Sequence, residues 1–171
     1  MSALEETTTW LEKAVIGLNL CPFAKAVHSK GQIRWVLSDA TEPTALLELL
    51  VHELQHLAAA DPESVDTTLI VHPQVMQDFM DFNDFLGVAE AALAELNLDG
   101  VLQIASFHPQ FQFDDITNAT NRSPYPTLHL LREDSVERAV AAFPAAEDIF
   151  QRNINTLQRL GPEGWTQLMS R

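Results

Sequence analysis

The order of short apolar runs and longer helical patterns constrains the fold of this chain more than any other feature. Four runs are predicted to be strands: Ile33–Leu37, Thr67–His72, Val101–His108 and Thr127–Arg132. Helical patterns cover Thr8–Leu20, Pro43–Ala59, Val75–Leu96, Ser135–Ala142 and Ala146–Leu160, the last of which is closed by Gly161 and Pro162. Strands that alternate with helices of this length are typical of βαβ units and a parallel sheet. We therefore expect a single α/β domain over residues 1–171, with about four mostly parallel strands covered by helices.

The charge of the chain limits the classes of partner. It carries 24 Asp and Glu against 10 Lys and Arg, a formal net charge of −14, and no Lys or Arg lies between Arg34 and Arg122. Such a surface repels phosphate backbones and anionic lipid headgroups. The composition therefore predicts no nucleic-acid partner and no membrane partner, and it leaves the oligomeric state open.

Cysteine usage and the N-terminal segment indicate the compartment. Cys21 is the only cysteine, so no intramolecular disulfide and no cysteine-rich zinc motif can form. The first ten residues are polar and acidic, unlike a signal peptide, and no apolar run approaches the roughly 20 residues that span a bilayer. We expect a cytoplasmic protein.

A polar loop between the last two predicted strands is the first candidate for a functional site. It runs from Pro109 to Tyr125 and is unusually long for a connection inside a compact domain, as binding loops often are. Arg122 offers a planar guanidinium that can bind a carboxylate or a phosphate. The residues expected to bind the substrate are Gln110, Asn118, Asn121, Arg122, Ser123 and Tyr125. Arg122 equally suits a structural role, pinning its own loop to nearby aspartates.

Two histidines and the cysteine are the candidates for chemistry. His72 and His108 each end a predicted strand and are each followed by Pro-Gln, so a parallel sheet brings them to the same edge. His108 is the expected acid–base group, and Cys21 the expected nucleophile or metal ligand. A site of Cys21, His72 and His108 with a divalent metal is an alternative, since three ligands and an open position are typical of catalytic zinc.

Two further histidine patterns are interpreted as structural. His52–His56 matches the H-E-x-x-H pattern of zinc proteases, but both histidines fall opposite the leucine face of their predicted helix and point to solvent. His129 lies in the middle of a predicted strand and is expected to be a hydrogen-bonded structural residue.

Three blocks of the sequence closely resemble a known family. They are Leu18–Ala24, Gln103–Pro109, and Thr120–Pro126 followed by Leu128–Glu133. They resemble an uncharacterised bacterial family catalogued as domain of unknown function 1415, over about Trp10 to Trp165. The resemblance implies a stand-alone bacterial protein and brings no activity, cofactor or substrate with it.

Three functional hypotheses follow from these residues. The first is an enzyme, a hydrolase or group transferase, that acts on a small anionic metabolite with His108 as acid–base group and Arg122, Asn118 and Asn121 holding the anion. The second is the metal-dependent enzyme with the Cys/His site. The third is a non-enzymatic acidic binding or adaptor protein that meets a basic partner.

Overall fold

The computed structural model describes residues 2–18, 21, 24–111, 122–142 and 149–169. Within them the chain has mixed α/β content, as predicted. The strands are β1 (Ile33–Leu37), β2 (Thr67–Val71), β3 (Leu102–Phe107) and β4 (Thr127–Arg132). The helices are α1 (Ala3–Trp10), the π-helical η1 (Leu11–Ile16), α2 (Ala24–Ser29), α3 (Pro43–Ala59), α4 (Phe79–Glu95), α5 (Glu133–Ala142) and α6 (Ile149–Met169).

The four strands form one sheet in the order β1-β2-β4-β3. β1 and β2 pair in parallel, whereas β4 pairs antiparallel with both β2 and β3. The prediction of mostly parallel strands is therefore wrong, because two of the three strand pairs are antiparallel. β3 does run in the direction of β2, but the chain returns through the long segment after β3 and places β4 between them. Neighbouring antiparallel strands need no crossover helix, so β4 can follow β3 and pair with it directly.

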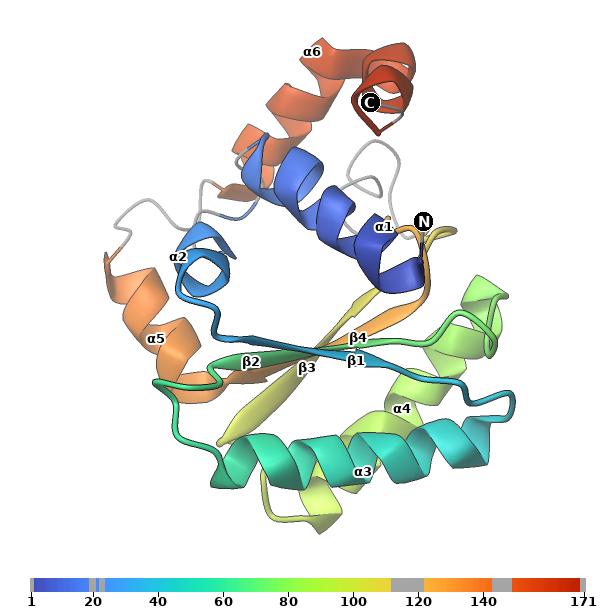
Figure 1. The fold of residues 1–171 in the computed structure, drawn as a ribbon, viewed down its shortest axis with the longest axis vertical. Coiled ribbons are helices and arrows are strands. Elements are labelled where there is room, and N and C mark those ends of the chain that lie inside the picture. The colour runs from blue at the N-terminus through green and yellow to red at the C-terminus, as the bar shows by residue number, and fades with distance from the viewer. Residues whose placement is uncertain (1, 19–20, 22–23, 112–121, 143–148, 170–171) are drawn as a thin grey trace.

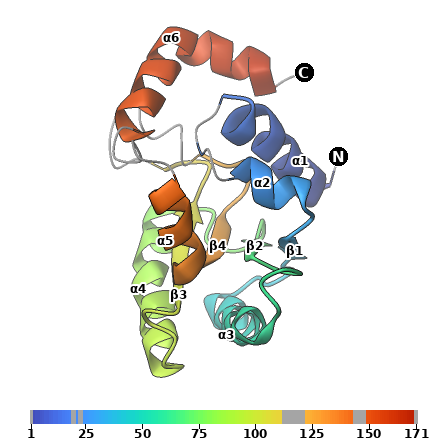
Figure 2. The ribbon, with the colours of Figure 1, turned by 90° about the vertical axis from the view of Figure 1, so that its left-hand side faces the viewer.

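Helices cover both faces of the sheet (Figure 1). α3 and α4 lie on one face, α1 and α2 lie on the other, and α6 lies beyond α1 (Figures 1 and 2). The larger core lies under α3 and α4, where Leu46, Leu50, Leu54 and Leu57 form a fully buried stripe at helical spacing. A smaller cluster on the opposite face joins Trp10, Leu11, Ala14 and Val15 to residues of β1 and β3.

Alternation along β4 assigns its side chains to these two faces. Leu128 and Leu130 are fully buried in the core under α3 and α4. His129 points to the other face, where its ring contacts Phe107 with the ring centroids 6.0 Å apart. β4 therefore places two polar side chains, Thr127 and His129, beside Leu131 on the face that α1 and α2 cover.

Local signals explain where the helix bounds differ from the predicted ones. α1 begins at Ala3 because Ser2 and Glu5 form a reciprocal capping box, a signal that the prediction of a start at Thr8 missed. α4 begins after Asp78, whose carboxylate accepts the amide hydrogen of Asp81, rather than at Val75. The last helical pattern is interrupted at Gly161 as predicted, with φ 70°, but helix resumes as far as Met169. No helix of the described ranges has the length and apolarity needed to cross a bilayer.

Candidate functional site

A pocket of about 680 Å³ opens on the sheet face that α1 and α2 cover. Its walls come from η1, Cys21, α2, the start of β1, the segment before β2, the end of β4, and α5. α2 and α5 lie beside the same end of the sheet in Figure 1. We call this hollow the α2–α5 pocket. Its floor includes Thr67, Leu69 and His129, side chains of two neighbouring strands.

His129 is held in one tautomer within this pocket. Its Nε2 lies 2.7 Å from the hydroxyl oxygen of Thr67, and that hydroxyl donates its single proton to the carbonyl of Leu130 at 2.5 Å. The hydroxyl must therefore accept the Nε2 hydrogen, which leaves Nδ1 with a free lone pair. Among the described residues Nδ1 has no hydrogen-bond partner. Burial lowers the pKa of His129 to about 4, so the imidazole is neutral at pH 7 and can accept a proton.

Cys21 lies in the wall of the same pocket. It is partly buried, and its side chain packs against the cluster formed by Trp10, Leu11, Ala14 and Val15. Its carbonyl accepts a hydrogen bond from the amide of Ala24 at the start of α2, with an N···O distance of 3.3 Å. The fold thus brings the only cysteine of the chain and His129 to one hollow.

The charges around the pocket differ in sign from the charge of the chain. Lys30, Arg132 and Arg138 line it, against Glu63 and Asp66, so its lining carries one net positive charge in a chain of net charge −14. The lining is therefore cationic relative to the rest of the chain. A charged ligand is repelled by side chains of its own sign and attracted by side chains of the opposite sign.

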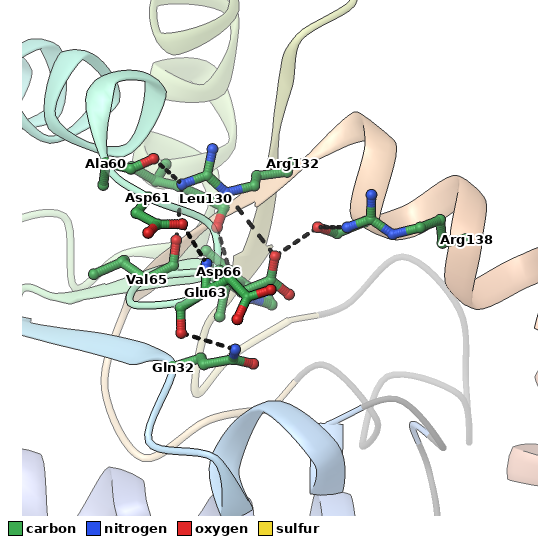
Figure 3. A network of polar contacts seen from close by, with 12 residues as sticks. Gln32, Ala60, Asp61, Glu63, Val65, Asp66, Leu130, Arg132 and Arg138 are labelled. Atoms are coloured by element: carbon green, nitrogen blue, oxygen red, sulfur yellow. Dashed lines mark hydrogen bonds and ion pairs between the residues drawn. The ribbon is translucent and has the colours of Figure 1, made fainter.

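One of the three cations has a structural role (Figure 3). Arg132 donates through Nη2 to the carbonyls of Ala60 and Val65, at 3.0 and 2.8 Å, and its Nε lies 3.9 Å from the carboxylate of Asp66. Ala60 follows the last residue of α3, so the guanidinium lies at the negative end of that helix. Ser135 donates to Asp66 from α5 at 2.5 Å. This network fixes the end of α3 and the start of α5 against the start of β2.

The other two cations are exposed. Arg138 on α5 donates a hydrogen bond to the hydroxyl of Ser135 at 3.3 Å. Lys30 follows the end of α2. Neither forms an ion pair with any carboxylate of the described residues, so both remain available to a ligand.

His72 and His108 lie at the opposite edge of the sheet, after the ends of β2 and β3. They come close together, because both rings pack on Phe82, with centroids 5.5 and 5.1 Å away. Both side chains are fully buried. His72 bonds through Nδ1 to the carbonyl of Val75, and His108 through Nε2 to the carbonyl of Met76.

The second nitrogens of this pair differ. Nδ1 of His108 accepts the amide hydrogen of Gln110 at 3.0 Å, so both of its ring nitrogens are occupied. Nε2 of His72 is buried without a hydrogen-bond partner among the described residues. Burial lowers the pKa of His108, and it lowers that of His72 to about 4. In this arrangement the two imidazoles anchor the segment between β2 and α4, and neither lines the α2–α5 pocket.

The structure describes part of the predicted substrate-binding loop. Arg122 donates from Nε to the carbonyl of Phe111 at 3.0 Å, and the buried Ser123 donates to the carbonyl of Tyr125. The hydroxyl of Tyr125 bonds to the carboxylate of Glu6 on α1, which raises the pKa of the phenol. Gln110 is exposed. Asn118 and Asn121, the other two predicted binding residues, lie outside the described residues.

The glutamate of the H-E-x-x-H segment has a structural role in α3. Glu53 is 2% exposed and accepts two hydrogen bonds from Arg34 of β1, at 2.7 and 3.3 Å, while His52 is 69% exposed. The carboxylate therefore faces the sheet and the first histidine faces solvent. Over the described part of the chain, no group of three or more His, Cys, Asp or Glu side chains is suited to hold a metal, and Cys21 is not grouped with His72 and His108.

A second hollow of about 620 Å³ lies near the starts of α3 and α4. Asp78, Asp81 and Asp84 line it, together with apolar side chains of the preceding segment and of α4. Three carboxylates and no basic side chain make this hollow unsuitable for an anion. The α2–α5 pocket is the better candidate for such a ligand.

Sequence reasoning missed most of the residues of the α2–α5 pocket. Cys21 was a candidate, but Thr67, Lys30 and Arg138 were not, and His129 was interpreted as structural. One signal was present: His129 is a polar residue between the buried Leu128 and Leu130, on the face that alternation assigns to the other side. The pocket walls gave no signal, because α2 has six residues and buries none of them.

The fold and the site define an α/β protein with a cationic pocket whose lining includes a cysteine and a neutral histidine. The chain belongs to the family described as "Protein of unknown function (DUF1415)", whose model matches residues 2–167. This confirms the resemblance seen in the sequence blocks. No curated protein and no solved structure matches the chain.

Proposed function

We propose that this protein is an enzyme, a hydrolase or group transferase, that acts on a small anionic metabolite in the α2–α5 pocket. The observation that carries the proposal is that one hollow holds Cys21, the neutral His129 and a net positive lining in a strongly acidic chain. Nucleophilic catalysis needs a nucleophile, a base and a group that orients the base. Cys21, His129 and Thr67 supply these three groups.

The chemistry proceeds in two steps. The thiol of Cys21 attacks an electrophilic carbonyl carbon, its proton moves to Nδ1 of His129, and the leaving group departs with that proton. Water or an acceptor then attacks the thioester, His129 takes up the proton of the incoming group, and the thiol of Cys21 is restored. Thr67 keeps Nε2 protonated throughout, so Nδ1 is the nitrogen that exchanges protons.

An anionic substrate makes His129 a better base. The pKa of about 4 arises from burial, which disfavours the imidazolium cation. A negative charge bound nearby favours that cation and raises the pKa toward neutrality, where general bases are most effective. His129 is therefore a weaker base in the ligand-free protein than in the complex with an anionic substrate.

The assignment of the acid–base role to His108 remains a competing hypothesis for the same reaction class. It places the chemistry at the opposite edge of the sheet, with Arg122 holding the anion. The imidazole of His108 is fully buried, and both of its nitrogens form hydrogen bonds to backbone groups. These properties of His108 make His129 the better candidate for the base. The two hypotheses predict that the reaction is lost on substitution of different histidines, His129 or His108.

Acylation of the protein by p-nitrophenyl esters, with and without a free carboxylate on the acyl group, distinguishes them. We expect a covalent acyl adduct on Cys21 by peptide mass spectrometry, no such adduct in Cys21→Ser, and a rate about 10²–10⁴-fold lower in His129→Gln. Lys25→Gln is the matched control, since Lys25 is exposed on α2 and does not line the pocket.

Two outcomes would contradict the proposal. The first is acylation that survives Cys21→Ser but fails in a folded His108→Asn variant. The second is ligand binding without turnover of any ester or thioester, which would favour a non-enzymatic binding protein.

A further inference from the structure

We infer that the ligand of the α2–α5 pocket is an aliphatic acyl compound with a free terminal carboxylate, whose chain lies on the sheet and whose carboxylate lies between Lys30 and Arg138. This inference rests on the proposed function, because it names the substrate class of the same pocket.

The interior of the pocket is mainly aliphatic. η1, α2, α5 and three strands contribute side chains without polar atoms: Leu11, Val27, Ile33, Leu69, Leu131 and Val136. A fully polar metabolite such as a sugar or a short polyacid would leave its hydroxyls or carboxylates against this surface without partners. A hydrocarbon chain gains affinity there, because it leaves water.

The two available cations lie on opposite sides of this aliphatic surface, one just after α2 and one on α5. Lys30 ends the α2 side and Arg138 projects from α5, and both are exposed and unpaired with any described carboxylate. Arg132, in contrast, already binds two carbonyls and Asp66. An acid group held by Lys30 and Arg138 leaves its chain to extend toward Leu69, His129 and Cys21.

The net charge of the lining selects the acid group. Three basic and two acidic side chains leave one positive charge, which a carboxylate neutralises and a phosphate dianion exceeds. A volume of about 680 Å³ lies within the range of small-molecule sites and accommodates a medium-length chain. The lining therefore fits a monoanion with a hydrocarbon body.

Isothermal titration of the full chain with straight-chain carboxylates from butanoate to octanoate tests this inference. We expect affinity to rise about fourfold with each added CH₂, as burial of a methylene group predicts. Octyltrimethylammonium tests whether the pocket requires a negative head group, and octyl phosphate tests whether it prefers one negative charge to two. Both should bind at least tenfold more weakly than octanoate.

Substitutions locate the two ends of the ligand. Lys30→Gln and Arg138→Gln should each weaken octanoate binding several-fold, while the control Lys25→Gln leaves it unchanged. Ala139→Trp places a large ring in the pocket wall and should abolish binding. Cys21→Ser should still bind octanoate, so a failed catalytic mechanism would leave this result intact.

Three results would overturn the inference. They are an affinity that does not depend on chain length, equal binding of the cationic amphiphile, and no effect of the Lys30 and Arg138 substitutions. Absence of binding by every carboxylate, in a protein that still forms the Cys21 acyl adduct, would reject this substrate class while leaving the proposed catalytic function in place.

Discussion

Replacement of Arg132 by leucine is expected to destabilise the protein far more than the same replacement of Arg138. Both arginines line the α2–α5 pocket, but only Arg132 is tied to backbone groups. Its side chain is 12% exposed, and its Asp66 partner is 18% exposed. Arg132→Leu removes two charge-assisted hydrogen bonds and leaves the Asp66 carboxylate without its cation.

The size of the loss follows from these contacts. A hydrogen bond to a charged group contributes about 1.5–3 kcal/mol, and water partly replaces the donor at carbonyls that are only partly buried. We therefore expect Arg132→Leu to lower the free energy of unfolding by about 2–4 kcal/mol. Arg138 is exposed, and within the described residues its side chain makes one hydrogen bond, of 3.3 Å to Ser135, so Arg138→Leu should cost less than about 0.5 kcal/mol.

Urea denaturation followed by circular dichroism measures both values in the same buffer. The wild-type chain and Lys25→Leu, another exposed cation substitution, serve as references. A difference of less than about 1 kcal/mol between Arg132→Leu and Arg138→Leu would refute the reasoning. It would mean that Arg132 is as free as Arg138 and that the pocket offers three cations to a ligand rather than two.

Three further predictions address the buried groups and the pocket. The pKa of His72 is near 6.5 unfolded and about 4 folded, so His72 alone should contribute a loss of about 3 kcal/mol of stability as the pH falls from 6.5 to 4, in addition to the loss from the similarly lowered pKa of His129; chemical denaturation across that range should show a weaker dependence in His72→Asn. Iodoacetamide should label Cys21 in the native protein, and Ala139→Trp should slow the labelling at least tenfold by mass spectrometry; labelling only in urea would contradict an accessible thiol. Tyr125→Phe should cost about 1 kcal/mol in thermal unfolding by removing the bond to Glu6, and an unchanged melting temperature would show that the contact adds nothing.

Strand positions were predictable from the sequence, and their order in the sheet was not. The predicted Ile33–Leu37 and Thr127–Arg132 are the observed β1 and β4, because short apolar runs bounded by turn residues carry a local signal. The insertion of β4 between β2 and β3 depends on pairing between distant segments. No local pattern encodes that choice, so the mostly parallel sheet was a wrong extrapolation from alternating strands and helices.

Only a small part of the candidate site was visible in the sequence. Cys21 stood out as the lone thiol, and His72 and His108 were expected together, which the shared contact with Phe82 bears out. The burial of the His72 and His108 imidazoles depends on how α4 packs on the sheet. The access of His129 to the pocket depends on the space that α2 and α5 leave above β4. These are tertiary properties, which residue type and spacing do not determine.

The placement of the site at His129 rather than at His108 can be measured most directly by NMR titration of the histidine Cε1 hydrogens with octanoate, with assignments from single His→Gln variants. We predict that the His129 resonance shifts and that its pKa rises above about 4 in the complex, while the His108 resonance stays in place. A shift confined to His108, with His129 unchanged at saturating ligand, would contradict this account.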